Sequence, residues 1–489
     1  MSMIKVENLT FSYPSNHDAV FEDVSFCIDT DWKIGFIGRN GRGKTTFLNL
    51  LLGKYEYSGN IHASVLFDYF PYFVADKSRL TEEILKEICP LAEEWELLRE
   101  LSYLKVDEDV FYRPFETLSK GERTKVLLAA LLLNEGHFLL IDEPTNHLDT
   151  QARKIVSDYL KRKKGFILVS HDRQFLDGCT DHILSINRSD IEVQSGNFSC
   201  WMENFERKQE AELARNEHLK KDIYRLQKSA ARTAVWSSHT EAKKTGAADK
   251  GYIGHKSAKM MKRAKSIEAR KKKAAEEKSG LLKNLETVSE LKIFPQSYHS
   301  DTLAAFSEVS PCYGGKAVCP PVTFAVRRGE RIVLDGRNGS GKSSLLKLLL
   351  GQKAAHTGTV TLGAGLVISY VSQDTSDLRG SLSDFARENR IEESLFKAVL
   401  RKMDFGRVQF EKDMSEFSEG QKKKTLLAKS LCEQAHLYIW DEPLNFIDVY
   451  SRMQIEDLIL HGCPTMLFVE HDEAFRKAVA TQTIHLPGL

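Results

Sequence analysis

Residues 38–46 read GRNGRGKTT, and residues 336–344 read GRNGSGKSS. Both stretches fit the phosphate-binding pattern G-x-x-x-x-G-K-[ST], in which glycines let backbone N–H groups surround phosphate oxygens at the positive end of a helix. The first stretch follows an apolar run at 34–37 and precedes the helix-like segment 47–52. Two such loops in one chain predict that the protein binds a nucleoside triphosphate twice.

The loop residues have separate expected roles. Lys44 and Lys342 should contact the β- and γ-phosphates, and the hydroxyls of Thr45 and Ser343 should hold Mg²⁺. The candidate ATP-binding residues of the two loops are Gly38, Asn40, Gly41, Gly43, Lys44, Thr45, Thr46, Gly336, Asn338, Gly339, Gly341, Lys342, Ser343 and Ser344.

The repeat extends beyond the two loops, because three further motifs recur at nearly the same offset. They are LSKGE at 118–122 with FSEGQ at 417–421, FLLIDEP at 138–144 with LYIWDEP at 437–443, and LVSHD at 168–172 with FVEHD at 468–472. The offset drifts only from 298 to 300 residues along the chain. The chain therefore holds two copies of one domain.

Each copy contains the other groups that phosphate hydrolysis needs. An apolar strand ends in an aspartate that lies beside the Mg²⁺ ion, and the adjacent glutamate is expected to orient or deprotonate the attacking water. A histidine at the end of another apolar run is expected to contact the γ-phosphate. The candidate catalytic residues are Glu143, Glu442, His171 and His471, and the strand-end aspartates are Asp142 and Asp441.

This order of motifs resembles the ATP-binding cassette (ABC) domain. The resemblance implies an α/β fold with two tandem P-loop ABC ATPase domains, paired head to tail around two ATP molecules. Ser418 and Gly420 would then complete the site of Lys44, and Ser119 and Gly121 that of Lys342. It also implies adenine stacking on Tyr13 and Tyr313, and metal ligation by Thr45, Asp142, Ser343, Gln373 and Asp441.

The chain departs from the family pattern in three places. The first copy has Tyr72 where the family has the glutamine that Gln373 supplies, its signature ends in Glu122, and the second copy has Leu444 within DEPLN. We therefore expect the two sites to be unequal.

Composition limits the classes of protein to consider. The chain has 489 residues, of which 42% are hydrophobic and 28% charged, values typical of a soluble globular protein with two or three domains. It has no 18-residue apolar run and no signal-peptide pattern. The eight scattered cysteines favour a reducing cytosol, so we expect a cytoplasmic protein.

The segment between the copies is strongly basic. We expect ABC domain 1 at 1–200, a linker at 201–300 and ABC domain 2 at 301–489. Residues 221–275 hold 16 Lys and Arg against 4 acidic residues, although the whole chain has a net charge of only +1. Apolar residues at coiled-coil spacing predict a long antiparallel α-helical hairpin; they are Leu219, Ile223, Leu226, Ala230, Leu281, Leu285 and Val288.

The expected turn of the hairpin lies at 237–254, within a tip loop at about 237–256, because this stretch has three glycines and no apolar periodicity. A basic helix can simply be a solvated surface, but interleaved aromatic residues here favour a nucleic-acid partner. The candidate tip residues are Trp236, Lys243, Lys244, Lys250, Tyr252, His255 and Lys256.

Two cassettes joined by such a linker resemble the ABC-F family of ATPases, specifically its Lsa-type antibiotic-resistance branch, over the whole chain. The resemblance implies ATP and Mg²⁺ as cofactors and a monomer whose cassettes pair within the chain. It implies binding at the ribosomal E site, with 23S rRNA and the peptidyltransferase centre as partners and P-site tRNA as a further candidate.

By the same resemblance, the linker would dislodge lincosamides, pleuromutilins and streptogramin A compounds, and ATP hydrolysis would release the protein from the ribosome. Two alternatives remain open at this point. One is a housekeeping ABC-F translation factor, and the other is a DNA-repair or scaffold ATPase.

Overall fold

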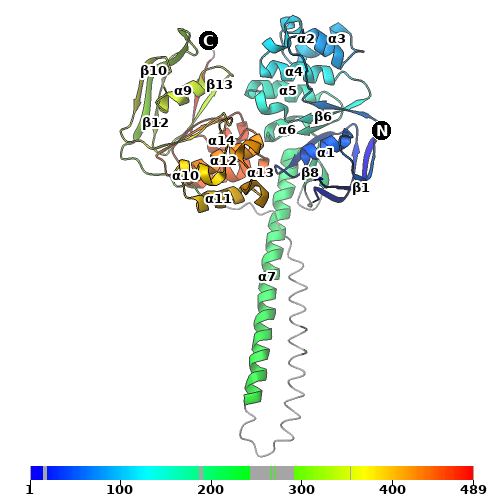
Figure 1. The fold of residues 1–489 in the computed structure, drawn as a ribbon, viewed down its shortest axis with the longest axis vertical. Helices are drawn as coiled ribbons and strands as arrows, with labels where there is room; N and C mark the ends of the chain where they lie inside the picture. The colour runs from blue at the N-terminus through cyan, green and yellow to red at the C-terminus, as the bar shows by residue number, and fades with distance from the viewer. Residues whose placement is uncertain are drawn as a thin grey trace, which may run out of the picture. The chain divides into compact units, whose positions relative to one another are not determined.

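The computed structural model describes residues 2–14, 19–186, 191–242, 266, 270, 291–352 and 354–487. The chain divides into two compact units (Figure 1). The first unit holds Met1–Ser199 and Val288–Leu489, and the second holds Cys200–Thr287. The first unit contains both repeated domains, which we call the first cassette (up to Ser199) and the second cassette (from residue 291).

The first cassette is built on a six-stranded sheet in the order β5-β6-β7-β3-β8-β9. All neighbouring strands are parallel except the pair β8 and β9. The central strands are continuous runs of buried apolar residues, as expected when helices cover both faces of a parallel sheet. The strands are β3 Lys33–Gly38, β5 Leu66–Phe70, β6 His137–Asp142, β7 Phe166–Val169, β8 His182–Ile186 and β9 Ile191–Ser195.

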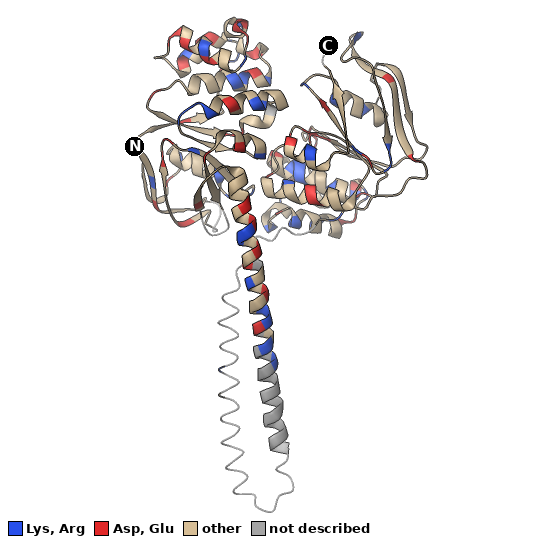
Figure 2. Ribbon diagram, turned by 180° about the vertical axis from the view of Figure 1, so that it is seen from behind, with Lys and Arg blue, Asp and Glu red and all other residues tan. Residues whose placement is uncertain are grey.

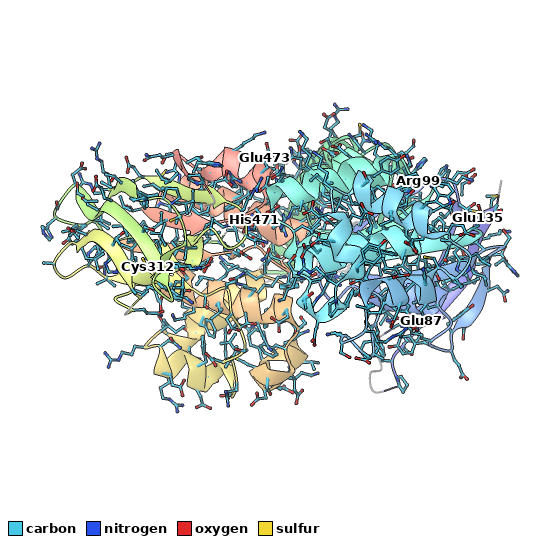
Figure 3. The ribbon with its side chains drawn as sticks, turned by 90° about the horizontal axis from the view of Figure 1, so that it is seen from above. Glu87, Arg99, Glu135, Cys312, His471 and Glu473 are labelled. Carbon is cyan, nitrogen blue, oxygen red and sulfur yellow. The ribbon has the colours of Figure 1, made fainter. Side chains whose placement is uncertain are left out.

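A smaller antiparallel sheet and the helices complete the first cassette. Glu87 and Arg99 mark α2 and α3 in Figure 3. The smaller sheet has the order β2-β1-β4, with β1 Met3–Phe11, β2 Phe21–Asp29 and β4 Ser58–His62. The α-helices are α1 Lys44–Leu51, α2 Thr81–Ile88, α3 Glu94–Tyr103, α4 Lys120–Leu131, α5 Thr150–Lys161 and α6 Arg173–Cys179, and the 3₁₀ turns are η1 Glu108–Tyr112, η2 Phe115–Thr117 and η3 Pro144–His147.

The second cassette repeats this plan. Its parallel sheet has the order β15-β16-β17-β13-β18, and β10 pairs with β11, β12 and β14 in a second, antiparallel sheet. The strands are β10 Thr302–Tyr313, β11 Lys316–Ala317, β12 Val322–Arg327, β13 Arg331–Gly336, β14 His356–Leu362, β15 Ile368–Val371, β16 Leu437–Asp441, β17 Met466–Val469 and β18 Gln482–Leu486. The helices are α9 Lys342–Leu349, α10 Leu382–Glu388, α11 Glu393–Lys402, η4 Arg407–Phe410, η5 Met414–Glu416, α12 Glu419–Cys432, α13 Val449–Gly462 and α14 Glu473–Val479.

In both cassettes the phosphate loop joins a central strand to a helix, β3 to α1 and β13 to α9. The strand-end aspartates Asp142 and Asp441 close β6 and β16. Because the carboxyl ends of parallel strands meet at one edge of a sheet, these groups come together. The predicted α/β architecture is confirmed.

The linker begins with one long helix, α7, Phe198–Ala242, which measures about 68 Å at 1.5 Å per residue. The predicted turn at 237–254 is wrong for 237–242, which are helical. A helix can continue through residues that lack apolar periodicity, and the first glycine after the start of α7 is Gly246. The second arm and most of the tip lie outside the described residues.

The charge of α7 changes sign along its length (Figure 2). Residues 203–217 carry five acidic and three basic side chains, whereas residues 218–232 carry five basic and one acidic. The basic half, residues 218–232, is the one that precedes the predicted tip loop in the sequence.

Two further findings concern the expected environment. Within the described part of the chain, no helix is both long and apolar enough for a bilayer. All eight cysteines are free thiols.

Candidate ATP sites

Both phosphate loops turn through left-handed glycines. The φ angle is +81° at Gly41 and +98° at Gly43, and it is +83° at Gly339 and +87° at Gly341. At Gly43 an added Cβ would lie 2.5 Å from Val20 Cγ1, which is too close for any side chain. The glycine spacing of the motif is therefore what lets each loop close over the first turn of its helix.

The two loop lysines have the same local environment. Lys44 Nζ donates to the carbonyl oxygens of Gly38 at 2.6 Å and Arg39 at 3.2 Å. Lys342 Nζ makes the same pair of contacts within its own loop, at 2.7 and 2.9 Å. Burial lowers the pKa of both lysines, although neighbouring carboxylates oppose the shift. A charged phosphate is the kind of partner that such buried ammonium groups need.

The oxygen atoms expected to hold Mg²⁺ lie together in both cassettes. Thr45 donates its hydroxyl hydrogen to Asp142 Oδ2 at 3.0 Å, and Tyr69 donates to the same oxygen at 3.0 Å. Burial raises the pKa of Asp142, and it raises that of Asp441 to about 6, against a hydrogen bond from Ser343. Asp441 Oδ1 is buried and has no hydrogen-bond partner among the described residues. These hard oxygen donors fit Mg²⁺.

The candidate catalytic glutamates follow the aspartates in a left-handed backbone conformation, with φ of +50° at Glu143 and +47° at Glu442. Residues other than glycine adopt this conformation at a cost of roughly 1–2 kcal/mol, and such strain is concentrated at functional sites. In both cassettes the glutamate N–H donates to the end of a neighbouring strand, at Val169 O (2.9 Å) and Val469 O (3.0 Å). The strain is thus held by the same backbone contact twice.

The side-chain environments of the two glutamates differ. Burial, reinforced by the charge of Asp142, raises the pKa of Glu143 to about 8. Burial also acts on Glu442, but the neighbouring His471 imidazole and the Gln373 amide outweigh it and lower the pKa to about 2. Asn445 Nδ2 also donates to Glu442 Oε2 at 2.6 Å. The pKa values of the two equivalent carboxylates are therefore shifted in opposite directions.

The two histidines lie beside these glutamates. His171 Nε2 is 3.3 Å from Glu143 Oε1 and 3.1 Å from Asn40 Oδ1. Burial, together with the charges of Lys44 and Arg452, holds the pKa of His171 well below its usual value. His471 Nε2 is 3.6 Å from the carboxylate of its own glutamate. Each histidine therefore lies beside the candidate catalytic glutamate of its own cassette.

The signature serine Ser418 caps the N-terminus of α12, and its hydroxyl accepts from Gln421 N at 3.3 Å. The first phosphate loop contacts the second cassette at the start of α12 and in the segment that follows β16. Asn40 Nδ2 donates to Phe446 O at 2.7 Å, and a Cβ on Gly420 would lie 2.8 Å from Asn40 Nδ2. Glycine is required at 420, because an added Cβ would also lie 2.6 Å from the Phe446 carbonyl oxygen. We call this arrangement, with Lys44 and Glu143, the first ATP site.

Charged contacts also join the cassettes at the first ATP site. Arg39 Nη1 and Arg42 Nη2 each lie 3.7 Å from Asp404 Oδ2. The Arg39 guanidinium also lies over the Tyr450 ring, 5.4 Å from its centroid. The first phosphate loop thus contacts the second cassette through Arg39 and Arg42, two positions that the phosphate-binding pattern leaves open.

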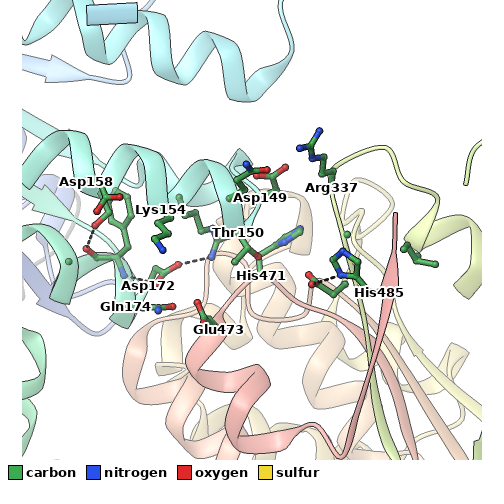
Figure 4. Close-up of a pocket in the computed structure, with 18 of the residues that line it drawn as sticks. Asp149, Thr150, Lys154, Asp158, Asp172, Gln174, Arg337, His471, Glu473 and His485 are labelled. Carbon is green, nitrogen blue, oxygen red and sulfur yellow. Dashed lines mark hydrogen bonds and ion pairs between the residues drawn. The ribbon is translucent and has the colours of Figure 1, made fainter. Parts of the chain in front are cut away.

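The second phosphate loop, with Lys342 and Glu442, forms the second ATP site, which is more open. Arg337 and Asn338 are exposed, and the loop borders a cavity of about 890 Å³. Residues of both cassettes line this cavity, and Figure 4 labels Asp149, Thr150, Lys154, Asp158, Asp172, Gln174, Arg337, His471, Glu473 and His485.

The cassettes still touch near the second loop. Arg476 Nη1 lies 3.4 Å from Thr150 Oγ1, and it pairs with Asp335 Oδ1 at 2.9 Å. Burial lowers the pKa of Lys342, and the charge of nearby Asp149 in the first cassette partly opposes that shift. The first cassette thus faces the second loop through the start of α5.

The predicted adenine-stacking tyrosines are tied to the helix that follows each loop. The Tyr13 hydroxyl lies 2.7 Å from Thr46 Oγ1, and that of Tyr313 lies 2.9 Å from Ser344 Oγ. The Tyr313 ring is 58% exposed. These contacts account for the hydroxyl-bearing residue at the last position of each motif.

Not every predicted residue is brought into a site. Ser119 caps α4 and exchanges hydrogen bonds with Glu122, and no contact of Ser119 or Gly121 with the second loop is found among the described residues. Tyr72 is half-buried, without a hydrogen bond in the described part of the chain. Trp236 lies in α7. The side chain of Trp236 and the other predicted tip residues are outside the described residues.

Sequence reasoning missed several residues around the sites. The aspartate after each site histidine pairs with a buried arginine: Arg153 with Asp172 at 2.7 Å, and Arg452 with Asp472 at 2.8 Å. The sequence repeat could have indicated this ion pair, because the arginine and the aspartate recur at offsets of 299 and 300 residues. Asp404 could not be found in this way, because the matching position in the first cassette holds Lys105.

The comparisons with known proteins agree with this geometry. The ABC transporter family model matches residues 21–146 and 319–445. The chain is 29% identical over 488 residues to the ribosome protection protein VmlR of Bacillus subtilis (strain 168), covering 95% of this chain and 83% of VmlR. It is 25% identical over 524 residues to the energy-dependent translational throttle protein EttA of Haemophilus influenzae, covering 96% of this chain and 89% of EttA.

A solved structure shares the fold. The archaeal ribosome recycling factor aABCE1, in complex with ribosomal stalk protein aP1, superimposes with a TM-score of 0.64 at 19% sequence identity, covering 98% of this chain and 87% of that chain. Together the two model matches cover more than half of the chain. The chain therefore belongs to the ABC transporter family, as an ATPase of the ABC-F type with two tandem cassettes.

Proposed function

We propose that the protein is an ATP-dependent ribosome-protection ATPase that binds the ribosomal E site in the cytoplasm. The observation that carries the proposal is the similarity to a ribosome protection protein over 95% of the chain. The contact of Asn40 with Phe446 and Gly420 supports the head-to-tail pairing of cassettes that ATP-driven closure requires. The ribosome need only bind the closed state to shift the population towards it.

We assign the site residues as follows. Lys44 and Lys342 neutralise phosphate charge, and Mg²⁺, when bound, withdraws electron density from the transferred phosphoryl group. Thr45 with Asp142, and Ser343 with Asp441 and Gln373, would hold that ion. Glu143 and Glu442 orient the attacking water, and the signature serines Ser418 and Ser119 would face the phosphate of the opposite cassette once the cassettes close around ATP.

We assign drug displacement to the linker. The basic half of α7 supports contact with rRNA, because phosphate binding by lysine and arginine is independent of sequence. The tip, including Lys243, Lys244, Lys250, Tyr252, His255 and Lys256, would approach the peptidyltransferase centre and dislodge lincosamides, pleuromutilins or streptogramin A compounds.

The first experiment tests whether the protein binds ribosomes in an ATP-dependent way. The variant Glu143→Gln with Glu442→Gln retains the phosphate and metal ligands, so it should bind ATP without turnover and accumulate with ribosomes during sedimentation. Lys44→Ala with Lys342→Ala is the matched control and should sediment less with ATP present. Equal sedimentation of both variants would refute ATP-driven ribosome binding, and no sedimentation of either would leave a DNA-repair or scaffold ATPase.

The second experiment separates ribosome protection from a housekeeping role in translation, which the similarity to EttA over 96% of the chain favours as the alternative. Cells that express the chain are tested for susceptibility to the three drug classes. A second strain expresses a variant in which a Gly-Ser turn replaces residues 243–256. Protection that depends on this segment supports the proposal, whereas unchanged susceptibility in both strains supports the translation factor.

A further inference from the structure

The signature helix of the second cassette, α12, is tied to the segment Ser372–Thr375, which we call the glutamine segment because it contains Gln373. Lys423 Nζ donates to Ser372 O at 2.7 Å, and Thr375 Oγ1 donates to Glu419 Oε2 at 2.6 Å. Lys423 Nζ also lies 3.5 Å from Asp441 O, the backbone of the strand-end aspartate.

The lysine in this contact is costly to bury. Lys423 is 1% exposed, and burial lowers its pKa to about 8. A buried ammonium group destabilises a fold unless its hydrogen bonds and charge partners compensate. Folding alone does not require a lysine here, because the first cassette adopts the same architecture without one.

The first cassette has different chemistry at each of these positions. Strands β5 and β15 pair with β6 and β16 in the same register, so Pro71 and Val74 occupy the positions of Ser372 and Thr375. Val74 is buried and apolar, and it cannot donate to a carboxylate. Equivalent segments therefore differ in how they are attached.

The signature helices differ in the same way. Thr124 occupies the position of Lys423, and its hydroxyl donates to Lys120 O of its own helix at 3.1 Å. Lys120 in turn replaces Glu419. The side-chain contacts between signature helix and glutamine segment are thus particular to the second cassette.

Together, α12 and the glutamine segment contact both ATP sites. The N-terminus of α12 is capped by Ser418, and Gly420 lies against Asn40 of the first ATP site. At the other end of the contact, Lys423 Nζ lies 3.5 Å from Asp441 O, next to Glu442 of the second ATP site, and Gln373 contributes to the low pKa of Glu442. A shift of α12 caused by nucleotide at the first site would therefore move the glutamine segment beside the second catalytic carboxylate.

We propose that Lys423 and Glu419 are positioning residues that couple the first ATP site to the second through α12 and the glutamine segment. The coupling runs from the first site to the second, because the described residues of the first cassette show no matching contacts between Pro71–Val74 and α4. It rests on the assignment of Glu143 and Glu442 as the catalytic carboxylates in the proposed function.

The test measures turnover at each site separately, on purified full-length protein without ribosomes. In a Glu143→Gln background, ATP hydrolysis reports the second site, and in a Glu442→Gln background it reports the first. Lys423→Met removes the donor and keeps the length of the side chain, and Thr375→Val installs the residue of the first cassette. Each should lower kcat at the second site by about tenfold, since small misplacements at an active site have effects of this size.

The expected pattern distinguishes positioning from a general loss of structure. KM at the second site should change by less than about threefold, and first-site kcat by less than about threefold, well below the effect of a 1 Å displacement. The control Thr124→Val, in the first cassette, should leave both sites unchanged. Should Lys423→Met fail to melt cooperatively, Thr375→Val decides the result.

A double-mutant cycle tests the coupling itself. Ser418→Ala should lower second-site kcat in the Glu143→Gln background, and it should lower it no further once Lys423→Met is present. Additive effects, an equal fall at both sites, or an unchanged second site would each overturn the proposal. Residual hydrolysis by the double Glu→Gln protein would instead show that the catalytic carboxylates are wrongly assigned.

Discussion

The tetrapeptide GRNG occurs twice, at 38–41 and 336–339, in two different environments. In the first ATP site Arg39 is buried and Asn40 is hydrogen-bonded across the cassette boundary, whereas Arg337 and Asn338 are exposed at the second. The same residues thus differ in burial and hydrogen bonding, because the cassette opposite each loop is different. The two loops are alike in their internal contacts and unlike in their external ones.

One position explains much of this difference. Asp404 follows α11 with a left-handed backbone, φ +69°, and Lys105 follows α3 in the same way, φ +52°. The first phosphate loop meets the Asp404 carboxylate, whereas the repeat aligns Asp404 with the ammonium group of Lys105. Because an arginine attracts a carboxylate and repels an ammonium group, we expect the two sites to close with unequal strength.

The largest expected effect comes from removing the catalytic carboxylates singly and together. Glu143→Gln with Glu442→Gln should lower ATP turnover by roughly 10²–10⁴-fold, the usual contribution of a general base. Each single variant should retain the turnover of the other site, so the two residual rates measure how unequal the sites are. Steady-state ATPase assays give the three values, and equal residual rates would contradict the structural inequality.

The second prediction exchanges the charges that separate the sites. Asp404→Lys should weaken ATP-dependent closure by about tenfold, or about 1.4 kcal/mol, because two arginines of the first loop would then face an ammonium group. Lys105→Asp should have the opposite effect at the second loop. Closure is measured by ATP titration of fluorophores placed on the two cassettes.

The control for this exchange is Glu411→Gln, an exposed residue near η4. It should leave the titration unchanged. Weakened closure in both charge exchanges would mean that Lys105 and Asp404 do not act at opposite sites.

The third prediction concerns pH. Since folding raises the pKa of Glu143 from 4.5 to about 8, its contribution to stability is fully present below pH 4.5 and is lost as the pH rises to about 8. Glu442 has the opposite sign, because its pKa falls to about 2. Its contribution is present above pH 4.5 and is lost as the pH falls towards 2.

Thermal melts test both signs. Relative to wild type, Glu143→Gln should raise Tm more at pH 8 than at pH 5, by roughly 2–4 °C for each kcal/mol. Glu442→Gln should lower Tm at both values, since its partners lose a charged acceptor. A pH-independent difference for Glu143→Gln would show that this carboxylate is ionised in the folded state.

Local patterns predicted the parts of each site and that the two sites would differ, but not the contacts between the cassettes that make them differ. Lys44, Asp142 and Glu143 lie in contiguous motifs whose spacing reflects one strand, one loop and one helix turn, so the repeat was sufficient to find them. Asp404 lies far along the chain from Arg39, and only the folded cassettes bring the two together. No periodicity records such a contact.

The linker shows the other limit of sequence reasoning. Residues 237–242 lack apolar periodicity, and the sequence therefore predicted a turn where α7 continues to Ala242. Apolar periodicity reports which face of a helix is buried, so its absence does not show where a helix ends. Helix propensity and the absence of glycine were the better guide in this segment.

The smallest expected effect comes from Tyr72→Gln, which gives the first cassette the residue that the second has at 373. Glu143 Oε1 is buried without a hydrogen-bond partner among the described residues, whereas Gln373 contributes to the low pKa of Glu442. A glutamine at 72 would offer an amide donor to Glu143 and lower its pKa, because a hydrogen bond to the charged form favours ionisation. In a Glu442→Gln background, the pH–rate profile of the first site should shift to lower pH, with kcat at pH 7 changed by only about two- to threefold. Tyr72→Phe removes the hydroxyl without adding an amide and should leave the profile in place. If Tyr72→Gln leaves the pH–rate profile in place as well, the difference between the two glutamates arises from burial rather than from the residue at this position.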